Sequence, residues 1–195
     1  MLRVSSCKML VIAMVAAFSG CAGIGARPPE HANAEDDEAQ RPRGEQLLEV
    51  ARVLAKHGDR VRAIQYLALA QRDGVPAQRV VPRLLALYAA DGQYRLAIDA
   101  AEGYLRRQPN DHKVRRCLGA FYIAVDARDE ALQTFETLVA EQPGDANAHF
   151  TLASLLAESG SQYARADEHF RTYLALAPAG RYADEARAKL LKVVP

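Results

Sequence analysis

The sequence repeats one short pattern, YLRRQPND at residues 104–111 and LVAEQPGD at residues 138–145. The Gln-Pro-x-Asp ending recurs after 34 residues, so Pro109 and Pro143 occupy equivalent positions. Proline lacks a backbone N–H and disfavours helical conformation in the residue before it, whereas aspartate is a common N-cap. Each copy therefore predicts the end of one helix and the start of the next, with Asp111 and Asp145 as caps.

The same period extends in both directions and divides the chain into four units. We expect them at residues 44–77, 78–111, 112–145 and 146–180, followed by a terminal helix within residues 181–195. Apolar residues recur at helical spacing in the third unit, at positions 114, 118, 121, 122 and 125. No unit of this size buries its apolar face alone, so the units must stack, and the polar terminal segment is expected to cap the stack.

Composition supports an all-α fold. The chain is rich in Ala, Leu, Arg, Glu and Gln, which favour helices, and it contains no Trp and few other aromatic residues. Its formal net charge of +1 lacks the strong basic excess typical of nucleic-acid binders, so no nucleic-acid partner is expected.

The unit at residues 112–145 resembles a tetratricopeptide repeat. The resemblance rests on the Leu-Gly-x-x-Tyr positions of the first helix and the Ala, Phe and apolar positions of the second. They are Leu118, Gly119, Tyr122, Ala131, Phe135 and Leu138, with Pro143 closing the unit. It implies a right-handed α-solenoid of about four helix pairs plus a C-terminal capping helix, in which Gly119 and Ala131 let two helices approach closely.

Two departures from the family pattern stand out. Pro82 falls inside the first helix of the second unit, so that helix either starts near Pro82 or bends there. The bulky position that usually holds Trp is Leu47, Val81, Arg115 and His149 in the four units, which predicts looser packing in the third and fourth units.

The resemblance also implies a peptide-binding groove, lined mainly by first-helix residues. Transferred position by position, the groove would contain Arg52, Arg79, Lys113, Arg116, Asn147 and Phe150. Its basic centre suits an acidic or carboxylate-bearing segment of a partner protein. On this interpretation the two Gln-Pro-x-Asp segments are elbows, the turns where one helix pair ends and the next begins. They have a structural role and contact no ligand.

The N-terminus has the order of an export signal. A short basic region with Arg3 and Lys8 precedes the ten-residue apolar run MLVIAMVAAF, and small residues follow. The segment FSGC resembles the lipobox of bacterial lipoproteins, which implies cleavage after a signal peptide at residues 1–20 and lipidation of Cys21. Ordinary secretion without lipid is the alternative. Residues 21–43 are acidic, Pro-rich and nearly free of large apolar side chains, which is typical of a disordered tether.

No catalytic, cofactor or metal site is expected. The five histidines are scattered, although His149 and His169 could meet across one helix pair and would then form only a weak metal site. The three cysteines do not form a disulfide or ligand pattern. Arg115 and Arg116 would lower the pKa of an exposed Cys117, but a small packed residue is the favoured interpretation.

Together these features predict a non-enzymatic lipoprotein adaptor. The resemblance to small repeat lipoproteins that pilot pilus secretins implies an outer-membrane, periplasm-facing anchor that helps assemble a pilus, secretin, secretion or outer-membrane complex. The alternative is a lipoprotein regulator of a peptidoglycan synthase or hydrolase.

Overall fold

The computed structural model describes residues 43–191, which form nine α-helices and no strand. The helices are α2 (Arg43–Lys56), α3 (Arg60–Arg72), α4 (Ala77–Ala90), α5 (Tyr94–Leu105), α6 (His112–Ala124), α7 (Arg128–Glu141), α8 (Ala146–Glu158), α9 (Tyr163–Leu176) and α10 (Ala183–Lys189). The predicted all-α solenoid is confirmed over this range. The predicted signal peptide, Cys21 and nearly all of the tether lie outside the described residues.

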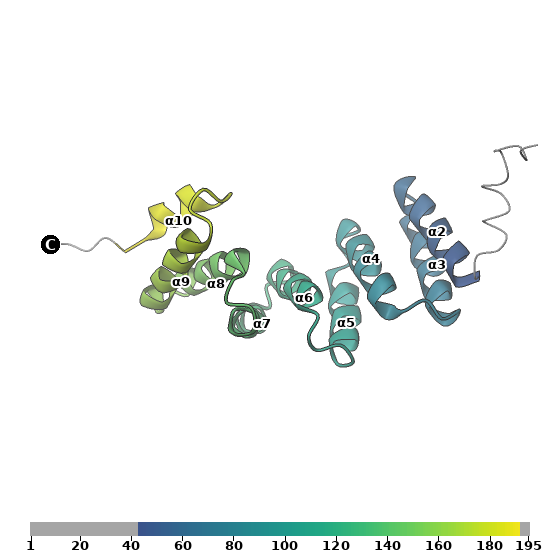
Figure 1. The fold of residues 1–195 in the computed structure, drawn as a ribbon, viewed down its shortest axis with the longest axis horizontal. Coiled ribbons are helices and arrows are strands. Elements are labelled where there is room, and N and C mark those ends of the chain that lie inside the picture. The colour runs from purple at the N-terminus through teal and green to yellow at the C-terminus, as the bar shows by residue number, and fades with distance from the viewer. Residues whose placement is uncertain (1–42, 192–195) are drawn as a thin grey trace, which may run out of the picture.

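Each helix packs against the next one along the chain, and the pairs follow one another in an extended array (Figure 1). The core is therefore a strip divided into three clusters. One surrounds Leu67 between α2 and α4, one surrounds Tyr104 between α4 and α6, and one surrounds Phe170 between α7 and α10. Such an array is stabilised by nearest-neighbour interfaces. Within residues 43–191, no helix combines the length and apolar character needed to cross a bilayer.

Aspartate side chains start three of the helices. Asp59, Asp111 and Asp145 each accept a hydrogen bond at 3.1 Å from the backbone N–H three residues later. Each bond satisfies an N–H that the helix itself leaves without a partner, and such a cap contributes about 1 kcal/mol. The predicted caps at Asp111 and Asp145 are confirmed.

A second polar bond closes the elbows of the third and fourth units. Arg115 Nη2 donates to the carbonyl oxygen of Pro109, and His149 Nε2 lies 3.1 Å from the carbonyl oxygen of Pro143. Both bonds join equivalent positions, six residues apart. Each side chain thus reaches back to its elbow, and His149 is buried. The looser packing expected at these two positions stays a prediction.

The close helix approach at Gly119 is confirmed. A Cβ atom there would lie 2.7 Å from Cε2 of Phe135, a ring that is itself fully packed. Pro82 lies within α4, which begins at Ala77, so of the two alternatives for this helix a start near Pro82 is excluded.

Replacing Gly119 by Ala should therefore destabilise the fold. Overpacking against Phe135 is expected to cost about 1–3 kcal/mol in the free energy of unfolding, measured by urea denaturation. The control is Gly103→Ala on α5, where a Cβ would approach no atom closer than 3.6 Å. That control should gain about 0.5–1 kcal/mol, because alanine favours the helix. Equal effects of the two substitutions would contradict the close approach at Gly119.

Candidate protein-binding groove

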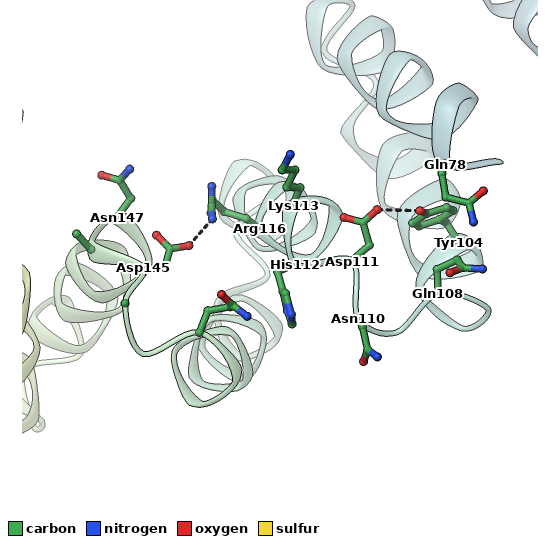
Figure 2. A pocket seen from close by; sticks show the side chains of 13 residues that line it. Gln78, Tyr104, Gln108, Asn110, Asp111, His112, Lys113, Arg116, Asp145 and Asn147 are labelled. Atoms are coloured by element: carbon green, nitrogen blue, oxygen red, sulfur yellow. Dashed lines mark hydrogen bonds and ion pairs between the residues drawn. The ribbon is translucent and has the colours of Figure 1, made fainter. Parts of the chain in front are cut away.

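A cavity of about 1020 Å³ opens where the helices of the second, third and fourth units meet at their elbows (Figure 2). We call it the elbow groove. It is lined by Gln78, Tyr104, Gln108, Asn110, Asp111, His112, Lys113, Arg116, Gln142, Gly144, Asp145, Ala146 and Asn147. These residues come from the start of α4, the end of α5, the elbows after α5 and α7, and the starts of α6 and α8, so the repeat register positions the whole lining.

Carboxamides dominate the polar lining of the elbow groove. Five of its residues carry one: Gln78, Gln108, Asn110, Gln142 and Asn147. A carboxamide both donates and accepts hydrogen bonds, as does each peptide unit of an extended chain. The lining can therefore pair with a peptide backbone without selecting its side chains.

The acidic side chains of the elbow groove already have partners. Asp111 caps α6 and accepts a 2.7 Å hydrogen bond from the Tyr104 hydroxyl, and Asp145 caps α8 and pairs with Arg116 (Figure 2). Burial and the bond to Asp111 raise the pKa of Tyr104 to about 12, so its hydroxyl remains a donor at neutral pH. Among residues 43–191, Lys113 has no acidic partner. Its ammonium group is therefore free to meet a carboxylate of a ligand, although the formal charges of Lys113 and Arg116 are balanced by those of Asp111 and Asp145 in the lining.

The structure brings together only part of the predicted groove. Lys113, Arg116 and Asn147 line the elbow groove. Arg52 and Arg79 line a separate cavity of about 420 Å³ between α2 and α4. There, Arg52 Nε bonds both Glu49 oxygens at 2.8 and 3.0 Å, and Arg79 pairs with Glu45. These two arginines therefore contribute less free positive charge than the sequence suggests.

The prediction that Phe150 lines the groove is wrong. It is only 8% exposed, and its ring stacks on Tyr182 with the ring centroids 4.4 Å apart. Phe170 and Tyr173 of α9 pack around the same ring. The segment leading into the terminal helix α10 thus covers Phe150, which belongs to the core and does not line the groove.

The elbows themselves are the part of the groove lining that the sequence interpretation missed. The Gln-Pro-x-Asp pattern indicates an architectural role, yet Gln108, Asn110 and Gln142 also line the groove. Gln108 and Gln142 are separated by one repeat period. Gln108 and Gln142 could have been predicted from the sequence, because a polar residue recurs at this position although it neither caps a helix nor packs in the core.

The two histidines of the fourth unit do meet, as predicted. His149 Nδ1 lies 3.0 Å from His169 Nδ1. Burial, with the neighbouring His149 and Arg165 adding to it, lowers the pKa of His169. No group of three or more His, Cys, Asp or Glu side chains in the described part of the chain is arranged to hold a metal ion.

Cys117 differs from both expectations made for it. It is exposed to solvent and is not a packed core residue. The protein around its sulfur nevertheless desolvates the thiol, and this effect outweighs the opposing charge of Arg116, so the pKa of Cys117 is raised.

Cys117 should consequently alkylate slowly at neutral pH. The rate of its reaction with iodoacetamide, followed by peptide mass spectrometry, should rise with pH to a midpoint that is higher in the folded protein than in the unfolded chain, because the thiolate is the nucleophile. In denaturant the same cysteine should titrate near its ordinary pKa, which makes the unfolded chain the control. A midpoint in the folded protein at or below that of the unfolded chain would contradict the desolvation at this site.

Comparisons with known proteins agree with this geometry. Residues 88–157 match the family model described as tetratricopeptide repeat. A tetratricopeptide repeat protein from Parabacteroides merdae ATCC 43184 is 20% identical with a TM-score of 0.69, covering 75% of this chain and 58% of that one. MamA from Desulfovibrio magneticus RS-1 is 20% identical with a TM-score of 0.61, covering 72% and 79%.

YrrB, described as a tetratricopeptide repeat protein with an unusual peptide-binding site, is 19% identical with a TM-score of 0.63 and 77% coverage of both chains. The comparison with curated proteins finds no match. At these identities the similarity to solved structures shows the fold. Residues 88–157 therefore match the tetratricopeptide repeat model, and the described residues 43–191 have the fold seen in these tetratricopeptide repeat structures.

Proposed function

We propose that this chain is a non-enzymatic scaffold that holds a segment of a partner protein in the elbow groove. The observation that carries the proposal is the groove lining, with five carboxamides and the unpaired ammonium of Lys113. Solenoids of this kind use their extended surfaces for binding. The peptide-binding site ascribed to YrrB, a protein of the same fold, supports the same use here.

The lining favours an extended segment with an acidic residue. The N–H and C=O groups of an extended peptide find acceptors and donors in the carboxamides, which supplies affinity that is tolerant of sequence. Lys113 adds a preference for a carboxylate, because the groove's own acids are engaged in caps and ion pairs. Arg116 is less available, since it already pairs with the Asp145 cap.

The proposal also places this scaffold on a membrane. The lipobox-like segment ending at Cys21 supports a lipid anchor, and an anchored adaptor at the periplasmic face of the outer membrane suits assembly of a pilus, secretin, secretion or other envelope complex. Regulation of a peptidoglycan synthase or hydrolase is the second candidate function. Identifying the protein that occupies the groove distinguishes the adaptor from the regulator.

Site-specific photo-crosslinking in intact envelopes tests the groove. A benzophenone amino acid at Asn147 should capture a partner, and Lys113→Glu should reduce that capture roughly 10-fold, as expected for a loss of about 1.4 kcal/mol. Reversing Lys113 alone leaves both residues of the Arg116–Asp145 pair in the protein. Lys56→Glu, at the end of α2, is the matched charge control, and a crosslinker at the exposed Tyr163 is the positional control.

Equal capture from both crosslinker positions, or capture insensitive to Lys113→Glu, would rule out the groove assignment. Pilus or secretin subunits in the adduct would support the adaptor, whereas peptidoglycan synthases or hydrolases would support the regulator.

Metabolic labelling with palmitate tests the anchor. Label should appear on the wild-type protein and be lost in Cys21→Ser, since acylation at Cys21 is the only lipid attachment that the sequence predicts. Cys117→Ser, which leaves the lipobox unchanged, should keep the label. An unlabelled wild-type protein would exclude the lipoprotein assignment while leaving the groove proposal intact.

A further inference from the structure

Two imidazole rings meet inside the fourth unit, outside the elbow groove. His149 on α8 and His169 on α9 face each other through their Nδ1 atoms at 3.0 Å, with ring centroids 5.2 Å apart. His149 is 7% exposed and His169 is partly exposed, so the pair is reachable from solvent on the His169 side.

The hydrogen bonds of the pair define its tautomers. His149 Nε2 lies 3.1 Å from the carbonyl oxygen of Pro143, which can only accept, so Nε2 carries the proton. His149 Nδ1 is then an unprotonated acceptor, and His169 Nδ1 donates to it. A histidine whose one ring N–H is held by a backbone carbonyl while its other nitrogen keeps a lone pair has the arrangement typical of a metal ligand.

We propose that His149 and His169 together bind a divalent late first-row transition ion such as Zn²⁺ or Ni²⁺ through their Nδ1 atoms. Imidazole nitrogens suit these ions. Two zinc–nitrogen bonds of about 2.05 Å at a tetrahedral angle separate the nitrogens by about 3.3 Å, so the observed pair has to open by only about 0.3 Å. Two protein ligands leave the remaining positions to water.

Binding requires a change of tautomer only at His169. Its proton moves from Nδ1 to Nε2, both Nδ1 lone pairs then face the ion, and no net proton is released. The charged groups acting on His169 are Arg165 and Glu168 from its own helix and Glu136 from α7. Arg165 Nη2 bonds Glu136 at 2.7 Å, so this carboxylate partly offsets the positive charge that the guanidinium places near the pair.

The proposal is tested by titrating Zn²⁺ into the full-length, metal-stripped protein with calorimetric detection. The wild type should bind one ion at the His pair. His169→Asn should weaken that binding by at least about 10-fold, because it removes one of the two protein ligands, a larger change than the loss of an outer partner. His57→Asn and His112→Asn are the controls. His112 is the sharper control, because its Nδ1 lies 3.2 Å from Glu141 Oε2, which places a histidine beside a carboxylate outside the proposed site.

A second measurement covers the case in which His169→Asn perturbs folding. In the ¹⁵N-histidine-labelled wild type, Zn²⁺ should shift the Nδ1 resonances of His149 and His169 and leave those of His57 unchanged. Absence of Zn²⁺ binding, unaltered affinity in a folded His169→Asn variant, or shifts confined to other histidines would each overturn the proposal. Partner binding is tested separately, by the Lys113→Glu variant in the crosslinking experiment. The groove proposal and the metal-site proposal can therefore fail independently.

Discussion

The structure depends on how each helical pair is joined to the next. At the elbows that open the third and fourth units, the aspartate fixes the first turn of the following helix through its side-chain cap. Four residues later, Arg115 or His149 reaches back to the proline carbonyl. The two bonds hold the proline, the cap and the new helix in one arrangement. The carboxamides in and beside these elbows, Gln108, Asn110, Gln142 and Asn147, are held in place by this arrangement and line the elbow groove.

The same device recurs at the end of the array in a modified form. Arg187 of α10 donates to the carbonyl oxygen of Pro178 at 2.5 Å, although it lies nine residues away. The aromatic cluster of Phe150, Phe170, Tyr173 and Tyr182 then covers the exposed end of the fourth unit. A solenoid must close its last apolar face in some such way, and the aromatic rings supply more apolar area than the small alanines of α10.

Local pattern was enough to predict the period, the helix pairs, the two caps and the close approach at Gly119. Each of these is encoded within one unit. Phe150 could not be placed in the same way, because its burial depends on Tyr182, which lies beyond the repeat. The availability of the Arg116 charge also escaped prediction, since Arg116 is engaged by Asp145 at the far end of its own unit, 29 residues away. The pairing of Arg79 with Glu45 could have been predicted more easily from the sequence, because the two residues are one repeat period apart.

The sequential packing has a thermodynamic consequence. In such an array each interface stabilises only its neighbours, so separate parts can open with different free energies. The elbow groove is built from the second, third and fourth units at once, from Gln78 to Asn147. A segment bound along it would favour the state in which these units are stacked together, by the linkage between binding and folding. With a segment bound in the groove, the second, third and fourth units would therefore unfold together, in one cooperative transition.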